Sequence, residues 1–218
     1  MDREIDIIAS EVTEFYNSNS VNELNYYDKK VIEYFHQIVN LIIEIAKEEN
    51  IKDIKLIDEQ FKRSKNTASE MIEEFIKVLH FYRRITRYII SEEIDVLTKI
   101  KYNFKLSYKL EMHNEIELAD CYFNIGDEEK ARKILLEFIK NNPDKDEPYQ
   151  CMQNWYMYIT PNMNKLAEVI DLAEKNGHTL ITDFGYATLV EHYEKIGDSK
   201  NKQKYQEFYD KWKINNED

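Results

Sequence analysis

The chain has 218 residues, of which 43% are hydrophobic and 13% aromatic, so it can bury a sizeable core in one or two domains. Its net charge is −12, which disfavours general binding to phosphate backbones. The first residues are acidic where a signal peptide would be basic, and the most apolar stretch, residues 38–46, is short and interrupted by polar residues. We therefore expect a cytoplasmic protein with no membrane partner.

The first 125 residues contain neither glycine nor proline. Because these are the commonest helix breakers, long helices can run through this part of the chain. Apolar residues recur at helical spacing within residues 31–45, 72–89 and 94–108, and no strand-like alternation competes with them. We predict an N-terminal helical region over residues 1–110, in which the helix pair at 71–110 could form a degenerate repeat.

Residues 112–145 form the most distinctive segment. A helical pattern of small and aromatic residues leads to a glycine turn, an acidic cluster favours the start of the next helix, and a proline ends the segment. The residues that carry this pattern are Leu118, Ala119, Tyr122, Gly126, Asp127, Ala131 and Pro143.

This segment resembles one tetratricopeptide repeat, a helix-turn-helix module that stacks on its neighbours. Three positions depart from the repeat pattern: Glu115 replaces a tryptophan, Leu135 replaces an aromatic residue and Phe138 replaces a small one. The resemblance implies a module that binds partners rather than one that transforms a substrate. It also implies neighbouring modules about 34 residues apart, since one module cannot bury its apolar faces alone.

Two weaker units follow, at residues 146–178 and 183–214. Leu166, Ile170 and Ala173 share one helical stripe in the first, and the second has aromatic residues on both helices and a turn at Gly197. In the first, Thr160 and Pro161 stand where the repeat has a glycine turn, which predicts one inserted residue. The last helix has a polar outer face, as a terminal cap needs. We therefore predict an all-α fold. Residues 111–218 are expected to form a right-handed α-solenoid of antiparallel helix hairpins, and the N-terminal helices to precede it.

The repeat resemblance implies that the first helix of each unit lines a concave groove. Amides in such a groove can pair with a peptide backbone, and acids would select lysine or arginine in the ligand. We expect a basic or neutral protein or peptide as partner, with self-association through residues 31–45 as an accompaniment. The predicted groove residues are Asp120, Phe123, Asn124, Gln150, Asn154, Met157, Tyr158, Glu191 and Glu194. Several of them could instead be exposed polar positions on a scaffold.

A second hypothesis arises from residues 51–75, which weakly resemble a DNA-reading helix-turn-helix within a region of net positive charge. Asp58 and Lys62 depart from that motif, and helix capping by Ser64, Asn66 or Thr67 is the simpler explanation. The alternative function is a peptide-responsive regulator that contacts DNA through this segment. Its candidate contacts with nucleic acid are Lys62, Arg63, Lys65, Asn66 and Thr67.

Nothing in the sequence indicates catalysis. The five histidines lack metal-binding spacing, and the chain has neither a glycine-rich phosphate loop nor a nucleophile elbow. We expect Cys121 and Cys151 to be small core residues rather than a disulfide. The expected protein is therefore not an enzyme and uses no metal or other cofactor.

Overall fold

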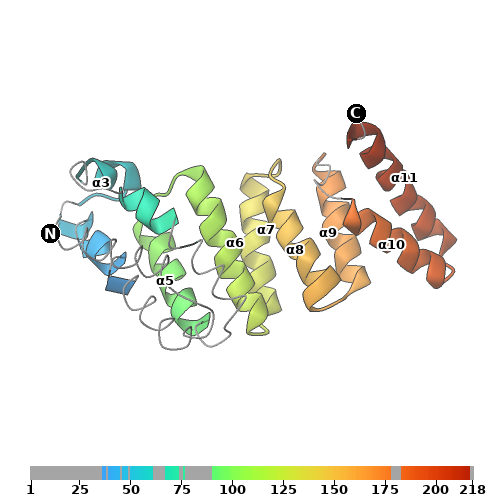
Figure 1. Ribbon diagram of the computed structural model, residues 1–218, viewed down its shortest axis with the longest axis horizontal. Helices are drawn as coiled ribbons and strands as arrows, with labels where there is room; N and C mark the ends of the chain where they lie inside the picture. Colours follow the sequence, from blue (N-terminus) through green and yellow to red (C-terminus); the bar gives the residue numbers. More distant parts are fainter. Residues whose placement is uncertain are drawn as a thin grey trace, which may run out of the picture. The chain divides into compact units, whose positions relative to one another are not determined.

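A computed structural model describes residues 36–60, 67–76, 90–177 and 183–216, apart from residues 38, 45, 49, 74 and 75. Every regular element among these residues is a helix, so the predicted all-α class is confirmed for the described chain (Figure 1). The chain divides into two compact units, Met1–Asp127 and Glu128–Asp218, which are described separately below.

The described helices of the first unit are α3 (Ile54–Gln60), α5 (Ile90–Asn103) and α6 (Tyr108–Asn124). Helices α5 and α6 pack against each other in antiparallel orientation. Lys101, near the end of α5, pairs with Glu115 in α6 at 2.7 Å, whereas Glu93, near the start of α5, accepts a hydrogen bond from Cys121 further along α6. Glu93, Glu115 and Cys121 are all buried, so polar contacts are part of this helix interface.

Backbone hydrogen bonds tie the start of α3 to the loop between α5 and α6. Lys105 donates its N–H to the carbonyl oxygen of Lys52 at 2.7 Å, and Ile54 donates to that of Lys105 at 3.2 Å. These bonds surround an isolated parallel bridge between Asp53 and Lys105. They satisfy backbone groups that would otherwise be costly to bury beside the core residues Ile54 and Phe104.

In the described residues of the second unit, 128–177 and 183–216, there are five α-helices and one π turn. Each helix packs on the next along the chain. The bounds are α7 (Glu128–Asn141), α8 (Glu147–Asn154), η2 (Trp155–Ile159), α9 (Met163–Lys175), α10 (Phe184–Lys195) and α11 (Ser199–Asn216).

Side-chain contacts show that these neighbours are antiparallel. Asn176, just beyond α9, donates to the Tyr149 hydroxyl near the start of α8. In the last pair, the rings of Tyr193 in α10 and Tyr205 in α11 stack with centroids 5.5 Å apart. The turn between α10 and α11 lies at Gly197, whose φ of +74° suits glycine because it has no Cβ. The predicted turns at Gly126 and Gly197 are both confirmed.

Large aromatic side chains fill much of the core of the second unit. Trp155 and four tyrosines are almost completely buried. A buried tyrosine needs a partner for its hydroxyl, and each of these four has one. Tyr149 donates to the carbonyl oxygen of Pro143, Tyr156 to Glu128, Tyr186 to Glu174 and Tyr205 to Asp171. Among the described residues, no helix is long and apolar enough to cross a membrane.

Candidate functional site

A solvent-facing strip runs along α8 and η2. Pro148 lies in the first turn of α8, where its missing N–H costs no helical hydrogen bond. It belongs to the buried face of α8, as do Tyr149, Met152 and Gln153. The opposite side of α8 and η2 carries four of the predicted groove residues. We call this set the α8 strip: Gln150 and Met157 are half-buried, Asn154 is exposed and Tyr158 is 64% exposed.

Gln150 and Asn154 are four residues apart, so their side-chain amides lie on one face of α8. Among the described residues, neither amide has a hydrogen-bond partner. Several other amides of the chain are engaged: Asn124 and Asn142 each donate to the backbone of their own helix, and Asn176 donates to Tyr149. The α8 strip therefore offers two donor-acceptor groups for an external partner.

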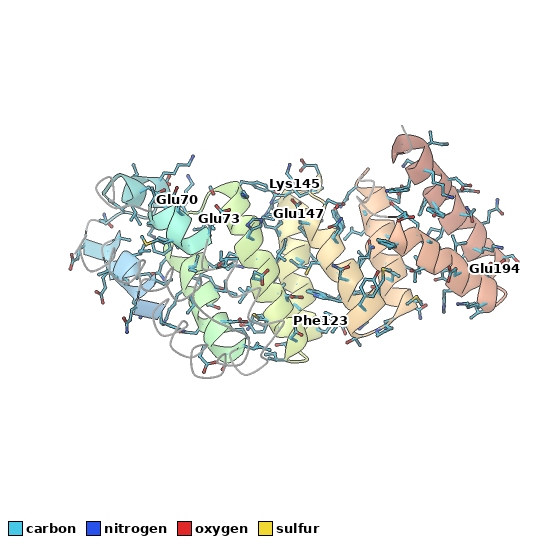
Figure 2. All side chains as sticks on the ribbon, viewed as in Figure 1. Glu70, Glu73, Phe123, Lys145, Glu147 and Glu194 are labelled. Atoms are coloured by element: carbon cyan, nitrogen blue, oxygen red, sulfur yellow. The ribbon has the colours of Figure 1, made fainter. Side chains whose placement is uncertain are left out.

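The predicted residues of α10, Glu191 and Glu194, are both exposed. Figure 2 labels Glu194. Each has a lysine partner within the protein. Glu194 pairs with Lys202 of α11 at 2.5 Å, and this hydrogen bond lowers the pKa of Glu194. Glu191 lies 3.8 Å from Lys195 one turn along the helix. Exposed ion pairs are weak, so both acids remain accessible, but the lysines cancel much of their local charge.

The predicted residues of α6 lie in the first unit. Asp120 is half-buried, and Asn124 is exposed but donates to the backbone carbonyl of Asp120 at 2.7 Å. Phe123, at the end of the same helix, is only 7% exposed (Figure 2). It therefore offers little surface to a partner, in contrast to Tyr158.

One polar cluster lies where α7, η2 and α9 meet. Glu128, the first residue of α7, accepts hydrogen bonds from Lys165 at 2.5 Å and from the Tyr156 hydroxyl at 2.6 Å. Arg132 donates to the same hydroxyl at 3.1 Å and pairs with Glu168 at 2.9 Å. The guanidinium and the Lys165 ammonium each lie within 6 Å of the Tyr156 ring centroid, a cation–π distance.

The pKa shifts in this cluster favour a structural role. Burial raises the pKa of Tyr156 to about 12, although its hydrogen bond from Arg132 acts in the opposite direction. Burial would also raise the pKa of Glu128, but hydrogen bonds from Lys165 and Tyr156 outweigh it, so this pKa is lowered. Near neutral pH the phenol keeps its proton and the carboxylate stays charged. Neither group is tuned to transfer a proton at that pH.

Of the candidate DNA contacts, Lys62, Arg63, Lys65 and Asn66 lie outside the described residues. Thr67 is described, and it caps the helical segment 68–73. Its N–H and hydroxyl both donate to Glu70, and its hydroxyl oxygen accepts from the Glu70 N–H, which is a capping box. The capping alternative is therefore confirmed for Thr67.

Asp58, the residue that departs from the helix-turn-helix motif, links α3 to this capped segment. Its carboxylate accepts hydrogen bonds from the Ser69 N–H at 2.8 Å and from the Ser69 hydroxyl at 2.5 Å. A carboxylate at the N-terminus of a helix is also favoured by the helix dipole. Asp58 thus has a structural role at a position where the DNA-binding motif has a small residue.

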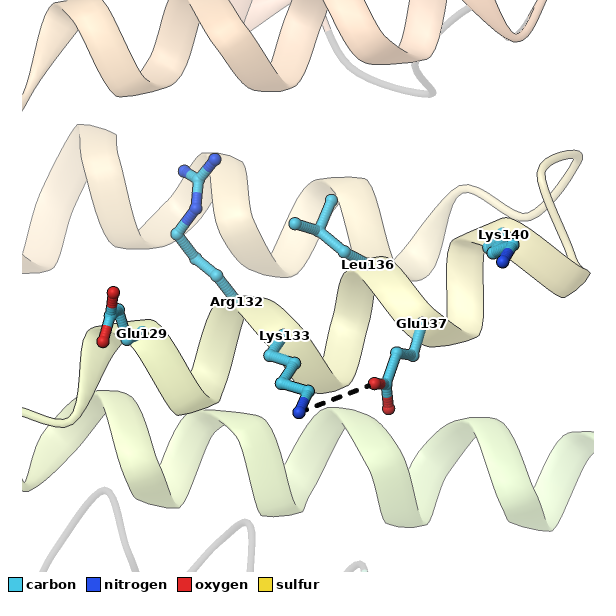
Figure 3. A pocket seen from close by; sticks show the side chains of 6 residues that line it. All are labelled: Glu129, Arg132, Lys133, Leu136, Glu137 and Lys140. Atoms are coloured by element: carbon cyan, nitrogen blue, oxygen red, sulfur yellow. Dashed lines mark ion pairs between the residues drawn. The ribbon is translucent and has the colours of Figure 1, made fainter.

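A shallow hollow of about 450 Å³ lies on α7 (Figure 3). Three of its five charged lining residues have ion-pair partners within the protein: Lys133 lies 4.0 Å from Glu137, and Arg132 pairs with Glu168. It therefore lacks the concentrated charge of an ion site. The lining residues are Glu129, Arg132, Lys133, Leu136, Glu137 and Lys140. In the described part of the chain, no group of three or more histidine, cysteine or acidic side chains could hold a metal ion.

Two exposed apolar residues near the α8 strip were not predicted from the sequence. Ile159 ends η2 and is 50% exposed, and Phe184 starts α10 and is 59% exposed. The helical spacing of the apolar residues predicts that Ile159 is buried. The wide turn of η2 exposes it instead. Phe184 is the first residue of its helix, where periodicity carries little information about burial.

Comparison with protein-family models, with curated proteins and with solved structures found no match for this chain.

Proposed function

We propose that this protein is a non-enzymatic adaptor of the helical-repeat type, similar to tetratricopeptide proteins, which binds an extended protein or peptide segment. The observation that carries the proposal is the α8 strip. Two amides without partners among the described residues, Gln150 and Asn154, share one helix face and are followed one turn later by the exposed ring of Tyr158. Side-chain amides can form hydrogen bonds with a peptide backbone, and an aromatic ring supplies apolar contact area.

The packing of the second unit supports a repeat architecture. The expected units 146–178 and 183–214 correspond to the pairs α8–α9 and α10–α11, both of them antiparallel. Consecutive packing from α7 to α11 is the arrangement that a solenoid of helix hairpins requires. On this proposal the first helices, α8 and α10, line the binding face.

Charge points to a basic or neutral partner. Residues 146–164 contain no lysine or arginine, and of their two acids Glu147 is exposed whereas Asp146 is buried. Glu191 on α10 is also exposed. A lysine or arginine in the ligand would be attracted to this face, whereas an acidic tail would be repelled.

The proposal can be tested with short fluorescein-labelled peptides of basic, neutral and acidic composition, by fluorescence anisotropy at physiological salt. We expect basic or neutral peptides to bind and Asn154→Ala to weaken binding by about three- to tenfold, the loss of one or two hydrogen bonds. The matched control is Asn164→Ala, which removes an exposed amide from α9. Equal binding by all three proteins would place the site elsewhere, and no binding of any peptide would oppose the proposal.

The regulator hypothesis predicts a different result. Salt-sensitive retention on duplex DNA by the wild-type protein, lost in Lys62→Glu/Arg63→Glu, would favour a DNA-contacting segment at residues 51–75. The adaptor proposal predicts no retention at physiological salt.

A further inference from the structure

The π turn η2 changes which side chains of the α8 strip face the solvent. Thr160 donates its N–H to the carbonyl oxygen of Trp155 at 2.8 Å, a bond that spans five residues instead of four. Such turns are rare inside helices and occur frequently at functional sites. The sequence predicted one inserted residue beside Thr160, and a wide turn of this kind accommodates an extra residue.

The burial pattern shows what the turn does. Tyr149, Met152 and Tyr156 are spaced by three and four residues, and all three are almost completely buried. In a continuous α-helix the next core position would be Ile159, three residues further on. Ile159 is instead half-exposed. The wide turn rotates it out of the core and places it beside Tyr158 at the end of the helix.

The two residues that begin the turn hold it rigidly. Trp155 and Tyr156 are almost fully buried, and their rings meet edge to face with centroids 6.4 Å apart. The Tyr156 hydroxyl is fixed by Glu128 and Arg132, as described above. The exposed pair Tyr158 and Ile159 therefore stands on a preorganised support, which lowers the entropic cost of binding.

We propose that η2 displays Tyr158 and Ile159 as an apolar anchor for an aliphatic or aromatic side chain of a basic, extended peptide. The inference rests on the proposed adaptor function and specifies its partner. Because no basic residue lies between Lys145 and Lys165, a positively charged partner meets no like charge from this segment. The amides of Gln150 and Asn154, earlier on the same strip, would pair with the backbone of the peptide that the anchor holds.

The test compares pairs of peptides that differ in one feature at a time. A fluorescein-labelled peptide with alternating leucine and lysine is the reference probe. One variant replaces leucine by serine and another replaces lysine by glutamate. We expect the wild-type protein to bind the reference peptide at least about tenfold more tightly than either variant, because each variant lacks one of the two contacts.

Protein variants then locate the contact. Tyr158→Ala and Ile159→Ala should each weaken binding of the reference peptide by about tenfold, the effect of removing a central interface side chain. Both residues are at least half-exposed, so neither change should unfold the protein, and a thermal melt of each variant checks this. Ile196→Ala and Ile214→Ala are the matched controls, because they remove equally exposed isoleucines away from η2 and should leave binding unchanged.

The outcomes show which of the two proposals fails. If the reference peptide binds and neither Tyr158→Ala nor Ile159→Ala weakens it, the anchor is wrong and the adaptor function stands. Tighter binding of the peptide in which glutamate replaces lysine would contradict the proposal that the partner is basic. If no peptide binds, both proposals fail. If sedimentation shows a dimer that Tyr158→Ala converts to a monomer, a second copy of this chain occupies the anchor, and the peptide inference is overturned.

Discussion

At the scale of single residues, Glu128 couples the stability of the second unit to pH. Its folded-state pKa lies below the ordinary value of 4.5 because hydrogen bonds from Lys165 and Tyr156 outweigh the effect of burial. The unfolded chain therefore binds a proton at Glu128 more readily than the folded chain does. The stability that this carboxylate contributes is complete above about pH 4.5 and is lost as pH falls through the lower, folded pKa.

We expect Glu128→Gln to unfold at lower urea concentration than wild type at pH 7 and to approach wild type as the pH falls towards 3. The measurement is urea unfolding followed by circular dichroism across this range. Glu129→Gln is the matched control, because Glu129 is the next residue along, is exposed and has no ion pair among the described residues. A constant difference between Glu128→Gln and wild type at every pH would contradict the assigned coupling.

Periodicity predicts residue burial well wherever a helix is regular. Leu166, Ile170 and Ala173 were expected on one stripe from their spacing, and all three are completely buried. Periodicity does not predict the exposure of Ile159. A change in backbone hydrogen bonding rotates this side chain around the helix axis, and the apolar pattern of the sequence stays the same. The carboxylate partners of the buried Tyr156, Tyr186 and Tyr205 also could not be predicted, since they lie on other helices.

At the scale of elements, Gly185 shows how closely α10 approaches the preceding helices. A Cβ on this residue would lie 3.0 Å from the side chain of Gln153 in α8 and 3.0 Å from that of Ile170 in α9. Both neighbours are buried, so neither can swing into solvent. Packing favours glycine here, in contrast to Gly126 and Gly197, where a positive φ angle favours it.

Gly185→Ala should therefore destabilise the protein. Overpacking costs about 1–3 kcal/mol, and the better helix propensity of alanine, worth about 1 kcal/mol, offsets only part of it. We expect the free energy of unfolding to fall by about 1 kcal/mol in a urea titration. In a Gln153→Ala background the same change should cost less, because one of the two close contacts is gone. An equal cost in both backgrounds would assign the strain to Ile170 alone.

Helix ends with strong signals were predictable from the sequence. The glycine turns after α6 and α10 lie where expected, and Thr67 caps its segment through a local pattern of side chains. The π turn had only an indirect signal, one residue too many beside Thr160 and Pro161. The extra residue predicts that the end of the helix departs from regular α-helical geometry. Packing against the surrounding helices then decides whether the chain forms a loop or a π turn.

At the scale of the whole molecule, net charge conceals how charges are arranged locally. The chain carries −12, yet α11 contains five lysines and two acids. The last predicted repeat unit, residues 183–214, was recognisable from its aromatic residues, but the pairing of its lysines with other helices was not. A binding face likewise depends on which side chains remain without internal partners, and this cannot be read from a linear pattern.

The lysines of α11 attach that helix to the preceding ones. Three ion pairs do so: Lys202 with Glu194, Lys204 with Asp171 and Lys211 with Glu174. Of the described side chains of α11, only that of Tyr205 is fully buried, so the helix relies on charge more than on aliphatic packing. The residues it exposes are polar apart from Ile214, which suits the end of a stack.

We therefore expect α11 to loosen selectively in salt. Raising the salt concentration from about 0.01 M to about 1 M shortens the Debye length from roughly 30 Å to roughly 3 Å. The two exposed pairs, Lys202–Glu194 and Lys204–Asp171, are each worth up to about 1 kcal/mol. The acid of the third pair, Glu174, is only 9% exposed, so salt screens that pair less. Weakening of the exposed pairs should speed amide hydrogen exchange in α11 by about fivefold. Exchange in α9, measured by mass spectrometry on the same sample, serves as the internal reference.

The double variant Lys204→Met/Lys211→Met supplies the control for this prediction. It removes two of the three pairs while keeping side chains of similar length, so its α11 should exchange faster than wild type at low salt and respond less to added salt. Equal salt responses in the two proteins would mean that aromatic packing around Tyr205, rather than charge, holds the last helix in place. In that case α11 would resist salt as well as α9 does, and the acids on α9 and α10 would be available to an external basic partner at little cost to the fold.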